Sequence, residues 1–241
     1  MRQCATRTAT CLAITAALWV LSGTLPAQQQ PDEAAVIRLI DAAVQKRFEH
    51  VLGFTDIEHY AVFRGKDETH PAAEMTVKTT YKKGVGKSYE VQSQSGSAIV
   101  QRFGLRPLLD NEKIVNLPGN VERSWFNSAN YQMKLRPGGV VQLDGRDCYV
   151  LDVKAKRKAP NMINGQLWVD AKDGSIVKLD GIATKSPSAF AGTTHLMRQY
   201  VELEGYPMGT HARAESNSAL IGRTVVVIDY GEYHLELAPA Q

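Results

Sequence analysis

Cysteine, paired metal ligands and excess charge are all scarce or missing in this sequence. Only three cysteines occur, and Cys4 and Cys11 lie in the leading segment, so Cys148 has no partner for an internal disulfide. None of the six histidines stands at ligand spacing from another histidine or a cysteine. The formal net charge is +3, and no aromatic and basic RNA-binding signature is present. We therefore expect no metal site, no cofactor, no disulfide framework and no nucleic-acid partner.

The leading segment carries Arg2 and Arg7 but no acidic residue, and an apolar stretch from Cys11 to Leu21 follows. This stretch is shorter than the about 20 apolar residues that a membrane-spanning helix needs. Small and turn-forming residues then lead to Ala27. The pattern predicts a secretory signal peptide over residues 1–27, cleaved near Ala27, and a single mature domain over 28–241. The expected location is the periplasm.

An amphipathic helix is predicted at the start of the mature chain. Apolar residues recur at helical spacing from Val36 to Leu52, with polar residues between them. Asp32 and Glu33 suit the first turn of this helix, and Gly53 suits its end. The wide apolar face requires a partner, and a sheet face is the expected one.

The spacing then changes to the alternation of strands. Met75, Val77, Thr79 and Tyr81 share one face of a predicted strand, and lysines and threonines occupy the other. Further strands are predicted from Tyr131 to Tyr230, joined by turns at 137–139, 144–145, 164–165 and 173–174. Between the two sets of strands, residues 97–109 predict two short helical pieces separated by Pro107.

These elements predict a mainly β protein of the α+β class. About ten antiparallel strands form a sheet that is too wide to stay flat, so it curls into a half-barrel. The helices cover its concave face. Such an arrangement forms an apolar trough beneath a lid, which is suited to a hydrophobic ligand. A fully packed core is the alternative interpretation of the same pattern.

Three stretches of the sequence resemble bacterial periplasmic proteins of the LolA/LolB lipoprotein-sorting type. They are DGRDCYVLDVKAKRK at 144–158, GQLWVD at 165–170 and the run from Gly181 to Ser188, and VVIDY at 226–230 is similar as well. The resemblance covers most of residues 32–235. It implies an incomplete antiparallel barrel closed by helices, which holds the acyl chains of lipoproteins or a lipid. It also implies a non-enzymatic role in envelope lipoprotein sorting and outer-membrane biogenesis.

Two other functions remain open. The same superfold includes RseB-type envelope sensors, so a sensor or scaffold that binds a membrane-anchored inner- or outer-membrane protein is the main alternative. An envelope enzyme with a dispersed site is the other, although the G-x-S-x-G pattern of serine hydrolases is absent. We expect no catalytic residues, and a monomer.

Candidate ligand-binding residues are the apolar side chains of the trough and lid. They are Leu39, Ile40, Val44, Phe48, Met75, Val77, Tyr81, Phe103, Tyr131, Met133 and Leu135. The only basic cluster consists of Lys154, Lys156, Arg157 and Lys158, and it is a candidate contact for an anionic headgroup or an acidic partner. A solvated strand end is its alternative interpretation.

Overall fold

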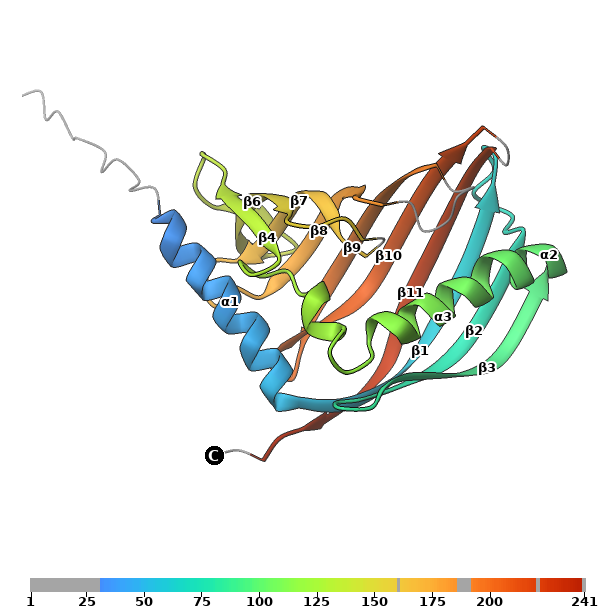
Figure 1. The fold of residues 1–241 in the computed structure, drawn as a ribbon, viewed down its shortest axis with the longest axis horizontal. Helices are drawn as coiled ribbons and strands as arrows, with labels where there is room; N and C mark the ends of the chain where they lie inside the picture. Colours follow the sequence, from blue (N-terminus) through green and yellow to red (C-terminus); the bar gives the residue numbers. More distant parts are fainter. Residues whose placement is uncertain (1–30, 160, 186–191, 220–221, 240–241) are drawn as a thin grey trace, which may run out of the picture.

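The computed structural model describes residues 31–159, 161–185, 192–219 and 222–239. The predicted signal peptide and part of the run from Gly181 to Ser188 lie outside these residues. The described chain forms one open antiparallel sheet of eleven strands, with helices on its concave side (Figure 1). The predicted fold class is therefore confirmed.

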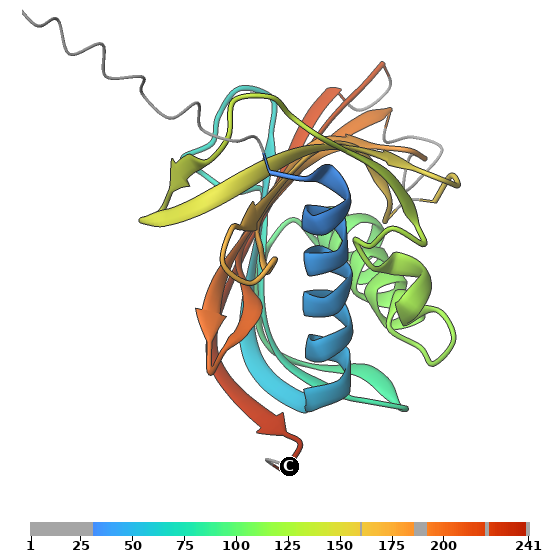
Figure 2. The same cartoon turned by 90° about the vertical axis from the view of Figure 1, so that its left-hand side faces the viewer.

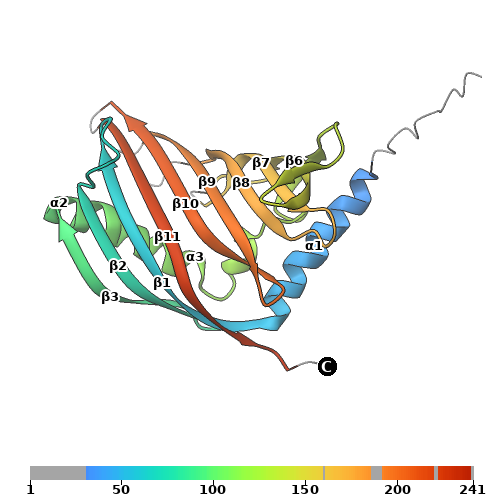
Figure 3. The ribbon, with the colours of Figure 1, turned by 180° about the vertical axis from the view of Figure 1, so that it is seen from behind.

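The eleven strands are β1 (Val51–Arg64), β2 (Ala73–Lys82), β3 (Gly86–Gly96), β4 (Tyr131–Leu135), β5 (Val141–Leu143), β6 (Arg146–Ala155), β7 (Ile163–Asp170), β8 (Ile176–Ala183), β9 (Thr193–Leu203), β10 (Tyr206–Ser218) and β11 (Gly222–Leu237). Their order across the sheet is β3-β2-β1-β11-β10-β9-β8-β7-β6-β4, and β5 pairs with β6 at one edge. Most neighbours are consecutive hairpin strands. The exceptions are the pair of β4 and β6 at one edge and the pair of β1 and β11 inside the sheet. In the second pair, Val51 faces Leu237 and Arg64 faces Thr224 (Figure 3).

The first helix, α1 (Glu33–His50), lies across the β4–β8 part of the sheet. The Asp32 side chain accepts a hydrogen bond from the amide of Ala34, which caps the helix. Val36 and Ile40 are buried against strands β4, β6, β7 and β8. The helix passes into β1 at Val51 without a loop, so the prediction that Gly53 ends it is wrong. Gly53 lies inside β1, where a Cβ atom would come within 2.9 Å of the Tyr81 carbonyl oxygen.

A second helical segment follows β3 and covers the other half of the concave face (Figure 2). It consists of α2 (Ala98–Val100), the π-helical turn η1 (Gln101–Leu105) and α3 (Arg106–Val115), and we call it the insertion. Pro107 lies in the first turn of α3, directly after the π-helical turn η1, in which the Arg106 amide donates to the Gln101 carbonyl oxygen. The predicted interruption at Pro107 is therefore wrong, and the helical path runs through it. The short helix η2 (Val121–Ser124) then leads to β4.

Two turns show where sequence interpretation succeeded and failed. Asp144 (φ 51°) and Gly145 (φ 76°) both have positive φ, as the predicted hairpin turn requires. The predicted turn at Asn164 and Gly165 is wrong, because both residues lie inside β7. Gly165 lies directly opposite Gly181 of β8, where a Cβ atom would meet the Asp180 carbonyl oxygen. The glycine is needed for this close strand approach and not for a turn.

Two separate apolar cores hold the helices to the sheet. The first joins α1 to β4, β6, β7 and β8, with Ile40, Tyr131, Leu151 and Leu167 among its members. The second joins the insertion to β1, β2 and β11. The two cores share no buried residue. The candidate functional site lies on the concave face between them.

Candidate functional site

Charged and phenolic side chains gather on the concave face between the two apolar cores. They come from β1, β3, β9, β11 and the insertion, and we call them the polar stripe: Asp56, Glu58, Lys87, Tyr89, Glu112, Arg198, Tyr230 and Tyr233. Strand alternation explains how β1 supplies two acids. Asp56, Glu58 and Tyr60 all point to the covered face and are 1%, 0% and 1% exposed, whereas His59 faces solvent.

Lys87 links the sheet to the insertion at one end of the polar stripe. Its ammonium nitrogen lies 3.0 Å from Oε2 of Glu112 and 3.5 Å from Oε1 of Glu58. Burial opposes the charged form of Lys87, but the two carboxylates hold its pKa well above the usual value. Burial alone would raise the pKa of the Glu112 carboxyl, but Lys87 and then Arg198 lower it to about 2. Glu58 also accepts a hydrogen bond from the Tyr60 hydroxyl. This end of the stripe is fully paired.

Arg198 occupies the other end of the stripe and is incompletely paired. Its Nη2 atom donates to the Tyr230 hydroxyl at 2.8 Å, and its guanidinium lies 4.9 Å from the centre of that ring. The buried Nε atom has no hydrogen-bond partner among the described residues. Burial opposes its charge, but Tyr230 and Tyr200 hold the pKa of Arg198 well above its usual value. The guanidinium therefore stays charged with one donor unused.

Asp56 is the least satisfied group of the stripe. Its side chain is 1% exposed, and neither carboxylate oxygen has a hydrogen-bond partner among the described residues. The Tyr233 hydroxyl lies close enough to oppose the rise in the pKa of Asp56, but it donates its hydrogen bond to the carbonyl oxygen of Gly209 at 2.8 Å. Burial, together with repulsion from Glu58, raises the pKa of Asp56 to about 7. A buried carboxyl without partners is costly in a folded protein and calls for an explanation.

The first helix contributes a further cation beside this region. Arg47 donates from Nε to the carbonyl oxygen of Pro207 at 3.0 Å, and its Nη2 lies 3.4 Å from Sδ of Met208. Burial lowers the pKa of Arg47, while the phenols of Tyr200 and Tyr81 oppose that shift. Helix α1 therefore reaches Tyr200 and Tyr233, which also lie near Arg198.

The predicted trough residues divide between the two apolar cores. Ile40, Tyr131 and Leu135 belong to the core under α1, and Val44 and Met133 pack against it. Met75 and Val77 belong to the core under the insertion. Tyr81 stacks on Phe54 with ring centres 5.2 Å apart. All of these predicted side chains except Tyr81 therefore lie in, or pack against, one of the two cores. Their contact with a ligand remains a prediction.

Three other predicted residues lie at the margins of these cores. The Phe48 ring lies 4.7 Å from that of Trp125, which follows η2. Leu39 is half-buried, and the tight turn at Gly174 approaches its backbone so closely that a Cβ there would lie 2.6 Å from the Leu39 carbonyl. Phe103 is 71% exposed and lies outside both cores.

The predicted basic cluster lies apart from the polar stripe, at the end of β6. Lys156 donates to the Ser128 carbonyl at 2.6 Å, and Arg157 donates to the Asn130 side chain at 3.1 Å and to the Arg123 carbonyl. These two residues thus hold the chain that follows η2. Lys154 and Lys158 are exposed. Contact of the cluster with a headgroup or a partner remains a prediction.

Sequence interpretation missed the polar stripe. The available signal was the alternation of Asp56, Glu58 and Tyr60, which places two acids on the same face as an aromatic side chain. Lys87, Glu112 and Arg198 could not be joined to them, because their proximity depends on the path of the sheet.

A metal cluster, a membrane-spanning helix and a reactive thiol have no structural support among the described residues. No group of three or more histidine, cysteine, aspartate or glutamate side chains is placed there to hold a metal ion. In the same part of the chain, no helix has the length and apolar character needed to cross a bilayer. The Cys148 thiol is buried, and burial raises its pKa to about 11, so it is a packing residue.

Comparison with known proteins finds similar solved structures only. No family model and no curated protein matches the chain. A LolA superfamily protein from Nitrosomonas europaea is 14% identical, with 84% of this chain and 94% of that chain covered and a TM-score of 0.44. A DUF1329 family protein from Desulfovibrio piger is 14% identical, with 86% of this chain and 94% of that chain covered and a TM-score of 0.43. A putative outer membrane lipoprotein-sorting protein domain from Vibrio parahaemolyticus is 13% identical, with 82% of this chain and 91% of that chain covered and a TM-score of 0.46.

All three TM-scores are below 0.5. At these identities and TM-scores the likeness concerns the fold, and it carries no argument about a ligand.

Proposed function

We propose that this protein is a non-catalytic binder of an amphiphile in the bacterial cell envelope. The ligand is a hydrophobic chain with a polar end, such as a lipid or the acylated end of a lipoprotein, and the location is the periplasm. One observation carries the proposal. The concave face holds a buried carboxylate without partners and a buried guanidinium with an unused donor, between two apolar cores.

The polar stripe suits the head of such a ligand. Arg198 Nε offers a charge-assisted hydrogen bond to a phosphate, carboxylate or ester oxygen. Asp56 offers acceptors to an amine or hydroxyl group, and Thr79, which faces Asp56 across β1 and β2, has an unpaired buried hydroxyl. A head with both donors and acceptors would satisfy atoms that the protein alone leaves unpaired.

The two apolar cores suit the chain of the ligand. Each helical cover is held by its own core, so one cover can move away from the sheet without breaking the core of the other. Each methylene group that enters contributes about 0.8 kcal/mol of transfer free energy. Tyr60, Met75 and Val77 extend along the concave face from the polar stripe into the core under the insertion. These side chains are 1% exposed or less, so an acyl chain would follow this line once the insertion moves away from the sheet.

The test compares ligand binding by the wild type, a variant of the polar stripe and a control variant with the same substitution elsewhere. Protein purified from the periplasm is examined by native mass spectrometry, and delipidated protein is titrated with a fluorescent acyl phospholipid. Arg198→Met should weaken binding about ten-fold or more, because a charge-assisted hydrogen bond of about 1.5–3 kcal/mol is lost. Arg136→Met is the matched control, because Arg136 makes only an exposed ion pair with Asp152 at 3.8 Å.

Two outcomes would contradict the proposal. Spectra without any acyl species in repeated preparations, together with no binding in the titration, would exclude an amphiphile. Equal affinity of the wild type and Arg198→Met would place the ligand elsewhere on the molecule.

A further inference from the structure

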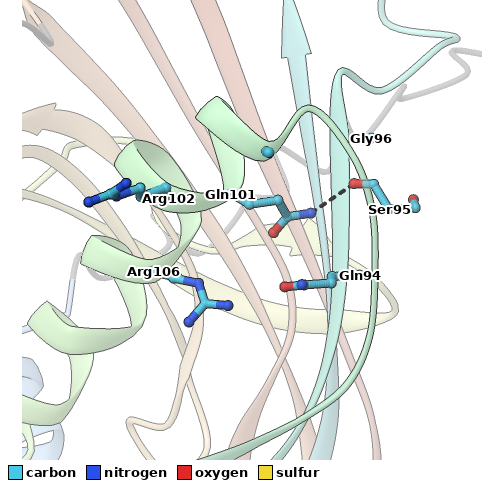
Figure 4. A pocket seen from close by; sticks show the side chains of 7 residues that line it. Gln94, Ser95, Gly96, Gln101, Arg102 and Arg106 are labelled. Carbon is cyan, nitrogen blue, oxygen red and sulfur yellow. Dashed lines mark hydrogen bonds between the residues drawn. The ribbon is translucent and has the colours of Figure 1, made fainter.

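A pocket opens at the far end of the sheet, where β3 ends and the insertion begins (Figure 4). Its volume is about 460 Å³, and it is lined by Gln94, Ser95, Gly96, Ala98, Gln101, Arg102 and Arg106. Gln101 fixes the inner wall, because its amide nitrogen donates to the carbonyl oxygens of Glu74 at 2.7 Å and Ser95 at 2.8 Å. Gln101 is 6% exposed, and its Oε1 atom has no hydrogen-bond partner among the described residues.

The pocket carries positive charge, and none of its lining residues is acidic. The first acid that follows in the insertion, Asp110, lies 3.8 Å from the ammonium group of Lys113. Arg102 and Arg106 are exposed, and neither forms an ion pair with a described residue. The sequence contains no acidic residue from Ser97 to Leu109. Glu74, whose carbonyl contacts Gln101, turns its carboxylate to His59 at 3.6 Å and to Ser95 at 3.4 Å. Two guanidinium groups are therefore available to an external anion.

The same end of the insertion exposes large apolar side chains. Ile99 is 70% exposed and Phe103 is 71% exposed, and they lie one helical turn apart. The opposite face of the segment carries Gln101, Leu105 and Leu109, which are buried against the sheet. The Arg102 guanidinium lies 5.4 Å from the centre of the Phe103 ring. The outer face thus combines two apolar anchors with two free cations.

We propose that this outer face docks on the surface of an anionic phospholipid bilayer. Ile99 and Phe103 enter the interfacial region, and Arg102 and Arg106 bind lipid phosphates. A bilayer fits better than a protein partner, because a stable protein interface buries about 1,200–2,000 Å² and a small apolar pair does not supply it. Bilayer binding needs only shallow apolar anchors together with basic residues. This surface is separate from the polar stripe, so the inference does not depend on the proposed ligand.

The experiment is vesicle flotation with the mature chain, residues 28–241. Vesicles of phosphatidylcholine alone are compared with vesicles that also contain phosphatidylglycerol. The protein should bind the anionic vesicles more strongly, and added salt should weaken that binding. Arg102→Gln and Arg106→Gln should each lower the partition coefficient about five-fold, and Phe103→Ser about ten-fold. Because these side chains are exposed, the variants should keep the wild-type melting temperature.

Two variants serve as matched controls. Arg136→Gln removes an arginine from the exposed ion pair with Asp152. Val201→Ser removes an apolar side chain of β9 that is 46% exposed. Both should bind vesicles like the wild type. Equal binding to the two kinds of vesicle, or no binding at low salt, would overturn the proposal. Displacement by inorganic phosphate that exceeds the displacement by sodium chloride at the same ionic strength would also overturn it, since the pocket would then serve a free anion. Amphiphile binding in the Arg198→Met assay is read separately and has no bearing on this outcome.

Discussion

The ammonium nitrogen of Lys87 lies 3.0 Å from Oε2 of Glu112, and this ion pair joins edge strand β3 to helix α3 of the insertion. The side chain of Lys87 is 8% exposed and that of Glu112 is 25% exposed. Glu58 of β1 lies on the other side of the same ammonium group. The insertion is therefore held to the sheet by a charged contact as well as by an apolar core.

Lys87→Met should lower the free energy of unfolding by about 3–5 kcal/mol, because it leaves two carboxylates without their cation in a buried site. Urea unfolding followed by circular dichroism measures the loss. Lys113→Met is the control, since Lys113 forms an ion pair with the exposed Asp110 at 3.8 Å and lies 5.8 Å from the centre of the Tyr89 ring. Its loss should cost about 1 kcal/mol or less. Equal stabilities of the two variants would mean that the buried pair is not formed in solution.

Asp56→Asn should change how the stability depends on pH. The pKa of Asp56 is raised from 3.8 to about 7, so between these values the folded protein holds a proton that the unfolded chain has lost. This group therefore makes the wild type less stable as pH rises, by up to about 1.4 kcal/mol per pH unit. The asparagine variant lacks this decline.

Urea unfolding of both proteins at about pH 5 and at about pH 8 tests this expectation. The stability of Asp56→Asn relative to the wild type should rise from the lower pH to the higher. A difference that stays constant, or that falls, would show that the carboxyl is not held in its neutral form.

Ile40→Ala should destabilise the protein by about 2–5 kcal/mol, because Ile40 is fully buried between α1 and the sheet. Thermal unfolding reports the loss. Arg38→Ala serves as the comparison on the same helix, since Arg38 is exposed and makes only a 3.7 Å pair with the exposed Asp32. Its effect should be within about 1 kcal/mol. If Ile40→Ala lowers the stability no more than Arg38→Ala does, α1 is not packed on the sheet.

Gly145→Val should cost about 1–2 kcal/mol, because Gly145 has a φ of 76° and a valine is strained in that conformation. No atom lies within 4 Å of the added Cβ position, so the effect comes from the backbone alone. Gly231→Ala is the matched substitution, at a glycine without positive φ and with equal space. It should leave the stability unchanged or raise it by about 0.5–1 kcal/mol. If both variants unfold at the wild-type denaturant concentration, the turn has another conformation.

The sequence was enough to predict the sheet, the first helix and the position of the insertion. Alternation marked Met75 and Val77 as one buried face, and both are 1% exposed or less. The glycine of the Asp144–Gly145 pair predicted a turn with positive φ, which the backbone has. These features are set by local spacing, which a single sequence displays.

Features set by distant contacts were not predictable in the same way. Val51 and Leu52 continue the helical spacing of apolar residues, but pairing with β11 draws Val51 into a strand. The Asn164–Gly165 pair has the composition of a turn, yet the approach of Gly181 places it inside the sheet. The polar stripe unites side chains from Asp56 to Tyr233, and no local pattern connects them.

The pairing of β1 with β11 has a consequence for how the molecule comes into being. Val51 pairs with Leu237, so the contact between β1–β3 and the rest of the sheet forms only after nearly the whole chain is available. Bringing such distant segments together carries a large loop-closure entropy and slows folding. A chain threaded through a membrane from its N-terminus would emerge as two unjoined hairpin arrays, with the edges of β1 and β10 open until the last strand arrives. Until β11 arrives, these open strand edges are the sites at which the chain would aggregate or bind a chaperone.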